Sequence, residues 1–149
     1  FGTAELVTAT VRSLRGGADD DSVLVLNHTS GVTSYLSASA VVGAPGPRIR
    51  ILGTKGALVI NELDPQEALL RAGMFPENGT WSIPTSSQAF IHRGDDVEEI
   101  EAVPGNYGHF YKAIELAINT GTPWPIPNSD ALLVASIIDQ AREIGTRAL

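Results

Sequence analysis

The sequence contains no cysteine in its 149 residues. This absence excludes disulfides, zinc–thiolate sites and cysteine nucleophiles from this stretch of chain. Basic residues are also scarce, because 10 Lys and Arg stand against 17 Asp and Glu, which gives a formal net charge of −7 at pH 7. A nucleic-acid-binding face needs the opposite charge, so we expect no nucleic acid partner.

Long apolar runs are missing as well. None approaches the roughly 18 residues that a membrane-spanning helix requires, and no secretory signal pattern is visible. We therefore expect no membrane partner and a cytoplasmic location. The chain opens on Phe1 rather than on methionine, from which we expect a piece of a longer protein. Apolar residues make up 43% of the sequence, which is enough for the core of one domain.

The first part of the chain has the patterns of β-strands. Predicted strands span residues 5–14, 22–29, 32–42, 48–52, 57–61 and 96–103. In the first of them, alternation places Val7, Ala9 and Val11 on one face. The second is apolar on both faces at its start, as in a central strand that is covered on both sides. We expect residues 65–73 to continue in an extended form and residues 74–90 to form a long loop.

The hydrophobic period then changes to that of helices. Asn106 can cap a first helix, which Gly121 and Pro123 end, and Asn128 or Ser129 can cap a second. The expected apolar faces are Tyr107, Phe110, Tyr111, Ile114, Ala117 and Ile118 in the first helix, and Ala131, Val134, Ala135, Ile138 and Ala141 in the second. Strands followed by helices predict an α+β fold, a largely antiparallel open β-sheet with helices packed on one face.

The stretch RIRILGTKGALVI, residues 48–60, places a lysine between two glycines and two apolar runs. A phosphate-binding loop of the Walker type needs four residues between its first glycine and Gly-Lys-Ser/Thr, and a helix must follow it. Neither condition is met here. Two strands joined by Thr54 and Lys55, with Gly53 and Gly56 on either side, instead predict a tight hairpin.

Candidate chemistry is sparse. No G-x-G-x-x-G stretch opens a helix, so no dinucleotide fold is visible. His28, His92 and His109 are widely separated, and none has a histidine partner at i+4, so a helical metal pair is excluded and no metal site is predicted. Glu99 and Glu101 share one face of their strand, which indicates a solvated edge strand rather than a catalytic carboxylate pair.

Aromatic residues gather at the start of the first predicted helix. Phe110, Tyr111 and the later Trp124 are expected to be helix-to-sheet core and a rigid loop anchor. Tyr107 differs, because a phenol at a helix start can reach a ligand in a cleft. The residues alone thus indicate an acidic α+β domain with no complete catalytic constellation.

Three stretches carry a resemblance when they are taken in order. They are RIRILGTKGALVI, PGNYGHFYKAIELAINTGTPWPI and NSDALLVASIIDQAREIGTRAL. Together they resemble the C-terminal domain of the Gfo/Idh/MocA family, the family of glucose–fructose oxidoreductase and inositol dehydrogenase, over almost the whole chain. LDPQEALLRAG, residues 63–73, and GVTSYLSAS, residues 31–39, are similar to a subgroup that includes scyllo-inositol dehydrogenases using NADP.

The resemblance implies a division of labour within a longer enzyme. Family members carry an N-terminal dinucleotide-binding domain with a glycine fingerprint, a Glu-Lys-Pro segment that supplies a catalytic lysine, and a later Asp-x-x-x-His pair. None of these occurs here, so residues 1–149 are expected to be the C-terminal substrate and oligomerisation domain, with no catalytic residue and no turnover of its own. NAD or NADP is expected in the full-length protein, with none bound to this stretch.

The resemblance also implies a substrate and a partner. The substrate class is a sugar or an inositol-like polyol, and Tyr107 and His109 are the substrate-binding candidates. The helix-free face of the sheet is expected to pack against a second copy of the chain. Candidate contacts on that face are Ser34, Tyr35, Ser37 and Ser39.

Two other classes of function compete with this interpretation. One is a non-catalytic β-sheet interaction module that only assembles subunits. The other is a free-standing carrier of a small ligand, which requires a closed pocket. The sequence leaves open which sugar or polyol is used, whether the dinucleotide is NAD or NADP, and whether the assembly is a dimer or a tetramer.

Overall fold

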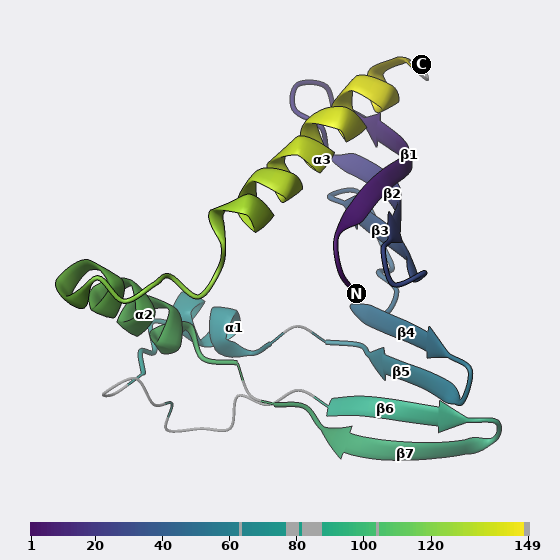
Figure 1. Cartoon of the computed structure of the whole chain (residues 1–149). Helices are drawn as coiled ribbons and strands as arrows, with labels where there is room; N and C mark the ends of the chain where they lie inside the picture. The colour runs from purple at the N-terminus through teal and green to yellow at the C-terminus, as the bar shows by residue number, and fades with distance from the viewer. Residues whose placement is uncertain (63, 77–80, 82–87, 104, 148–149) are drawn as a thin grey trace. The chain divides into compact units, whose positions relative to one another are not determined.

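The computed structural model describes residues 1–62, 64–76, 81, 88–103 and 105–147. The chain forms two compact units. One comprises Phe1–Gly43 and Ile126–Leu149, and the other comprises Ala44–Pro125. Each unit contains one antiparallel sheet, and the three helices are divided between them (Figure 1). The predicted α+β class is thereby confirmed, with the strands divided between two sheets.

The first unit is a three-stranded meander with one helix. Strands β1 (Ala4–Arg12), β2 (Asp21–His28) and β3 (Thr33–Ser39) pair antiparallel in that order. Helix α3 (Asn128–Arg147) packs against β1. The buried apolar side chains of this unit are Ala9, Leu26, Ile137 and Ala141. β2 is central as predicted, but Val23 is exposed, so α3 covers only one face of the strand within the described residues.

A β-bulge interrupts the predicted alternation of β1. Leu6 pairs with Leu26 and Thr8 with Val25, so Val7 is the extra residue between them. The expectation that Val7 shares a face with Ala9 is therefore wrong, and Val7 is exposed while Ala9 is buried. A bulge resets the two-residue period, which a pattern read from one strand does not reveal.

The buried stripe of α3 also differs from the predicted one. Ile137, Ala141 and Gly145 are buried, whereas Val134 is 57% exposed. Of the expected stripe only Ala141 is buried, since Ile138 is exposed too. Close packing accounts for the last residue of this stripe: a Cβ on Gly145 would lie 2.6 Å from the Val11 backbone nitrogen, so α3 approaches β1 closely at that point.

The second unit contains a four-stranded antiparallel sheet. Its order is β4 (Ile49–Gly53), β5 (Gly56–Ile60), β6 (Gln88–Arg93) and β7 (Asp96–Glu101). The predicted hairpin at Thr54-Lys55 and the strand at β7 are confirmed. Strand β6 was not predicted, and its first residues fall in the stretch that the sequence assigned to a loop. The rest of that loop lies largely outside the described residues.

Two helices belong to the second unit. Helix α1 (Gln66–Arg71) corrects the expectation of an extended segment there. Its first turn is set by Asp64, whose Oδ1 accepts from the Gln66 backbone N–H at 2.9 Å. Helix α2 (Tyr107–Thr120) matches the prediction, with an Asn106 cap and Gly121 in the left-handed conformation at its end.

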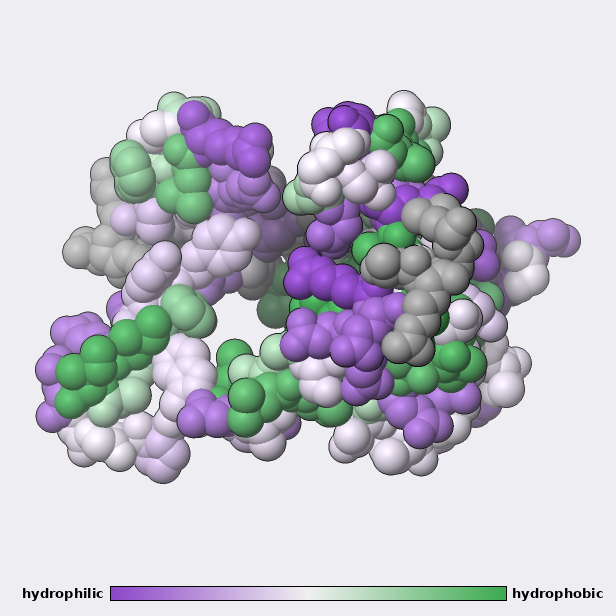
Figure 2. All heavy atoms as spheres, turned by 90° about the horizontal axis from the view of Figure 1, so that it is seen from above, coloured by the Kyte–Doolittle hydropathy of each residue, from purple (hydrophilic) through white to green (hydrophobic). Residues whose placement is uncertain are grey.

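The sequence predicted that the aromatic residues of α2 are core residues, and the structure shows that they are not. Phe110 is about half exposed, and Tyr111 is 67% exposed. Phe110 contacts Trp124 edge to face, with ring centroids 5.5 Å apart. Figure 2 shows hydrophobic side chains at the surface next to polar ones, in keeping with helices that are only partly covered within the described residues. No described helix is both long enough and apolar enough to cross a membrane.

Candidate functional site

The first turn of α2 carries both substrate-binding candidates. The Asn106 Oδ1 atom accepts a hydrogen bond from the His109 backbone N–H at 3.2 Å, which satisfies one of the free donors of the helix start. Tyr107 is 47% exposed, and His109 is exposed. The structure therefore presents both side chains to solvent at one helix end, as a ligand-binding role requires.

Asp64 and Gln66, which the sequence did not single out, hold this turn in place. The Tyr107 backbone N–H donates to Gln66 Oε1 at 3.0 Å, and the Gly105 backbone N–H donates to Asp64 Oδ2 at 2.9 Å. Gln66 Oε1 also accepts from the Trp81 indole N–H at 3.0 Å. The start of α1 thus lies against the start of α2, as Figure 1 shows.

Gln66 is the most deeply buried polar residue of the described chain. Its side chain is fully buried, and its Oε1 atom accepts from two donors, which fixes the orientation of the amide. Among the described residues its Nε2 atom has no hydrogen-bond partner. A buried donor without a partner costs on the order of 1–3 kcal/mol. The two hydrogen bonds that Gln66 Oε1 accepts link the start of α1 to Trp81 and to the start of α2.

The backbone of Gly105 lies close to the side chains of Asp64 and Gln66. A Cβ at this position would lie 2.0 Å from Asp64 Oδ2 and 2.5 Å from Gln66 Nε2. Both distances are far below van der Waals contact. A side chain at residue 105 would therefore displace the side chains of Asp64 and Gln66.

The three histidines have separate surroundings. His28 lies in the first unit, where its ring nitrogens are 3.2 Å from the Gly2 carbonyl oxygen and 2.8 Å from Ser34 Oγ. His92 belongs to β6 and His109 to α2. Among the residues that the structure describes, no three His, Asp or Glu side chains are grouped so that they could hold a metal ion.

The acidic residues of β7 are engaged at the surface. Glu98 forms an ion pair with Arg93, with Nη1 and Oε2 2.7 Å apart, and Glu99 accepts a hydrogen bond from the Gln88 side chain. Both pairs join the neighbouring strands β6 and β7 of one sheet. These contacts agree with a solvated edge strand and give the carboxylates a local structural role.

The helix-free face of the first sheet contains most of the predicted oligomer contacts. Tyr35 pairs with Val25, and Ser37 pairs with Val23. Tyr35 is 77% exposed. Ser34 does not belong to this face, because it pairs with the buried Leu26 on the side that α3 covers. Its hydroxyl instead contacts His28.

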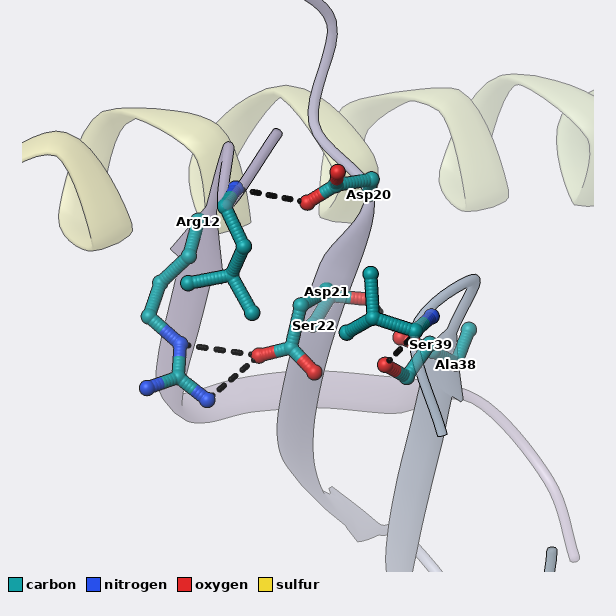
Figure 3. A network of polar contacts seen from close by, with 8 residues as sticks. Arg12, Asp20, Asp21, Ser22, Ala38 and Ser39 are labelled. Atoms are coloured by element: carbon teal, nitrogen blue, oxygen red, sulfur yellow. Dashed lines mark hydrogen bonds and ion pairs between the residues drawn. The ribbon is translucent and has the colours of Figure 1, made fainter. Parts of the chain in front are cut away.

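A network of polar contacts lies at one end of this sheet (Figure 3). Arg12 forms an ion pair with Asp21 on the neighbouring strand, with the Nε and Oδ2 atoms 2.8 Å apart. The Leu14 backbone N–H donates to Asp20 at 2.7 Å, and the Arg15 side chain donates to the same carboxylate. These bonds favour the charged form, and they lower the pKa of both Asp20 and Asp21.

Comparison with known proteins places these features in a family. Residues 1–143 match the model of the oxidoreductase family C-terminal alpha/beta domain, GFO_IDH_MocA_C. The chain is 31% identical to scyllo-inositol 2-dehydrogenase (NADP(+)) IolW of Bacillus subtilis over 96% of its own length and 42% of that protein. It is 28% identical to the uncharacterized oxidoreductase YdgJ of Escherichia coli over 93% of its length and 41% of that protein.

Solved structures give the same result. The putative oxidoreductase yvaA of Bacillus subtilis superposes with a TM-score of 0.79 at 30% identity, and the match covers 99% of this chain and 45% of that one. A putative oxidoreductase of Bacteroides fragilis superposes with a TM-score of 0.79 at 32% identity, over 100% of this chain and 47% of that one. The chain spans less than half the length of each of these proteins.

Proposed function

Because this chain belongs to the Gfo/Idh/MocA oxidoreductase family, as its C-terminal alpha/beta domain, we propose that it forms the substrate-binding part of an NADP-dependent polyol dehydrogenase. The observation that carries the proposal is the 31% identity to scyllo-inositol 2-dehydrogenase (NADP(+)) over 96% of the chain. The substrate is an inositol or a related sugar. A dinucleotide-binding domain elsewhere in the full-length protein completes the enzyme.

The reaction is the oxidation of a secondary alcohol to a ketone. The bound nicotinamide supplies the hydride acceptor, and the alcohol proton passes to a base outside the described residues. The residues of this chain are not suited to hold the dinucleotide, because no glycine fingerprint opens a helix. The start of α2 is already occupied by Asn106 and Gln66. This chain is therefore assigned to binding and orienting the substrate, and no catalytic residue is assigned to it.

Tyr107 and His109 are the residues proposed to contact the polyol. A phenol and an imidazole both exchange hydrogen bonds with hydroxyl groups. Their backbone is held by Asn106 and Gln66, so a ligand has to order only the two side chains and not the backbone. The exposure of both residues leaves them available to a substrate.

An activity assay on the full-length protein tests this function. We expect reduced dinucleotide to appear when scyllo-inositol is offered with NADP, and more slowly with NAD. A panel of inositols and aldoses then ranks the substrates by kcat/KM. Absence of turnover with every polyol and both dinucleotides would contradict the proposal and favour the alternative, a β-sheet module that only assembles subunits.

We also propose that the helix-free face of the β1–β3 sheet joins two copies of the protein. Tyr35 and Val23 are exposed on that face, and Ser37 adds little bulk beside them. The exposed apolar side chains of this face are removed from water only when a second surface covers them. Light scattering well above micromolar concentration should report an oligomer that Tyr35→Glu weakens, and a wild-type monomer would refute the interface.

A further inference from the structure

We propose that Asp64 and Gln66 form a positioning clamp that fixes Tyr107 for substrate binding. This inference rests on the proposed function and deepens it. Asp64 holds the Gly105 backbone N–H, and Gln66 holds the Tyr107 backbone N–H, at 2.9 and 3.0 Å. Two of the free N–H donors around the helix start are thus satisfied by side chains from another element, 41 residues earlier in the sequence.

The clamp is itself built rigidly. Asp64 Oδ1 accepts from the Gln66 backbone N–H at 2.9 Å, so the two clamping residues are bonded to each other. The Trp81 indole N–H donates to the same Gln66 oxygen that holds Tyr107. Gln66 is fully buried, which leaves its side chain little freedom. A displaced Gln66 would therefore move the backbone of Tyr107 with it.

The space at Gly105 gives an independent indication of how tightly the parts fit. A Cβ there would overlap the Asp64 carboxylate and lie 2.5 Å from Gln66 Nε2, so the backbone of Gly105 lies close to both clamping side chains. Close approach and paired hydrogen bonds together define the position of the Tyr107 Cα atom. A misplacement of about 1 Å at a reacting substrate can cost about a hundredfold in rate. Asp64 and Gln66, which fix the position of Tyr107, therefore influence the substrate without contacting it.

The test replaces Gln66 by methionine, which has a similar length but no amide acceptor. Glu67→Gln is the matched control, because Glu67 is the next residue of α1, is exposed and contacts Arg71. Two readouts are compared in the full-length protein. One is NMR of the Trp81 indole N–H and the Tyr107 amide. The other is steady-state kinetics with scyllo-inositol and NADP.

We expect Gln66→Met to shift both resonances and to raise the KM for scyllo-inositol roughly two- to tenfold, as loss of the Tyr107 hydrogen bond itself would. The KM for NADP should stay within about twofold of wild type, because Tyr107 is proposed to contact the polyol and not the dinucleotide. A variant that was merely destabilised would change both KM values alike. Glu67→Gln should match wild type in every measurement. If Gln66→Met does not fold, Asp64→Asn is measured instead, with the same direction of change and a smaller size.

Three results would overturn the clamp. One is an unchanged Tyr107 amide in Gln66→Met, another is a shifted amide with an unchanged KM for scyllo-inositol, and the third is an equal rise in both KM values. A wild-type protein that oxidises no polyol overturns the proposed function and, with it, the role of the clamp in substrate binding. The resonances then decide separately whether Asp64 and Gln66 hold the start of α2.

Discussion

At the scale of single residues, Gly56 shows how space and backbone conformation act together. Its φ of 154° lies in a region that other residues rarely adopt, and a Cβ would lie 2.6 Å from the His92 carbonyl oxygen. Gly53, at the other end of the same turn, has neither property, because a Cβ there would lie in ordinary contact, 3.5 Å from the Gly56 carbonyl oxygen. The hairpin thus needs one of its two glycines.

This difference predicts unequal effects of alanine. Gly56→Ala should lower the free energy of unfolding by about 1–3 kcal/mol, because it adds backbone strain and a close contact. Gly53→Ala should change it by less than about 0.5 kcal/mol, as surface substitutions usually do. Urea unfolding of the two variants provides the comparison. Equal losses would show that the contact with His92 is not the cause.

Asp20 and Asp21 make stability depend on pH in the acid range. Hydrogen bonds from the Leu14 backbone and the Arg15 side chain lower the pKa of Asp20, and the Arg12 side chain lowers the pKa of Asp21. A pKa that is lower in the folded chain means that the stabilisation is fully present above the unfolded pKa and is lost as pH falls through the folded one.

We therefore expect the urea midpoint of the wild type to fall as pH decreases below about 4. Asp20→Asn should lower the midpoint at pH 7 and flatten the acid decline, because the variant has no carboxylate to protonate at that position. Unfolding curves at several pH values measure both effects. Parallel profiles for wild type and variant would contradict this assignment.

The candidate site was only partly predictable at this scale. Tyr107 and His109 could be chosen because they sit at the start of a helix whose cap is encoded locally by Asn106. Gln66 could not be chosen, because its role depends on partners 15 and 41 residues away. The DPQ sequence marked a family subgroup, yet only the fold shows which donors it satisfies.

At the scale of elements, local signals decided which predictions succeeded. The bounds of α2 follow from Asn106 and Gly121, both of which act within one turn of the helix end. Helix α1 has only 6 residues, too few for a helical period to be recognised. Strand β6 is a short apolar run whose structure is set by pairing with β5 and β7.

The contact between α3 and β1 gives a prediction for this scale. Gly145→Ala should destabilise the chain by about 1–3 kcal/mol, because a Cβ would lie 2.6 Å from the Val11 nitrogen and force the helix away from the strand. This loss opposes the gain of roughly 1 kcal/mol that alanine brings to a helix interior. Asp139→Ala, on the exposed side of α3, is the control and should show no loss.

Thermal or urea unfolding of Gly145→Ala measures this balance. A stabilised variant would mean that helix propensity outweighs close packing and that α3 lies further from β1. Such a result would also mean that Gly145 does not belong with Ile137 and Ala141 to the face of α3 that meets the sheet.

At the scale of the whole molecule, the fold class and family were accessible from the sequence. The order of strands and helices predicted an α+β fold, and the ordered motifs resembled the family that the comparison then showed. The division of the strands into two sheets was not accessible. The segment between β3 and β4 contains Gly43 and Pro47, which break a strand, but no local pattern tells whether the next strand joins the same sheet.

The central claim is that this chain binds the polyol and supplies no group to the chemical step. The most direct measurement is the steady-state kinetics of Tyr107→Phe in the full-length protein, with Tyr111→Phe as the control one turn further along α2. Loss of one hydroxyl hydrogen bond of about 0.5–1.5 kcal/mol should raise the KM for scyllo-inositol roughly two- to tenfold and leave kcat within about twofold. A collapse of kcat with an unchanged KM would contradict the account.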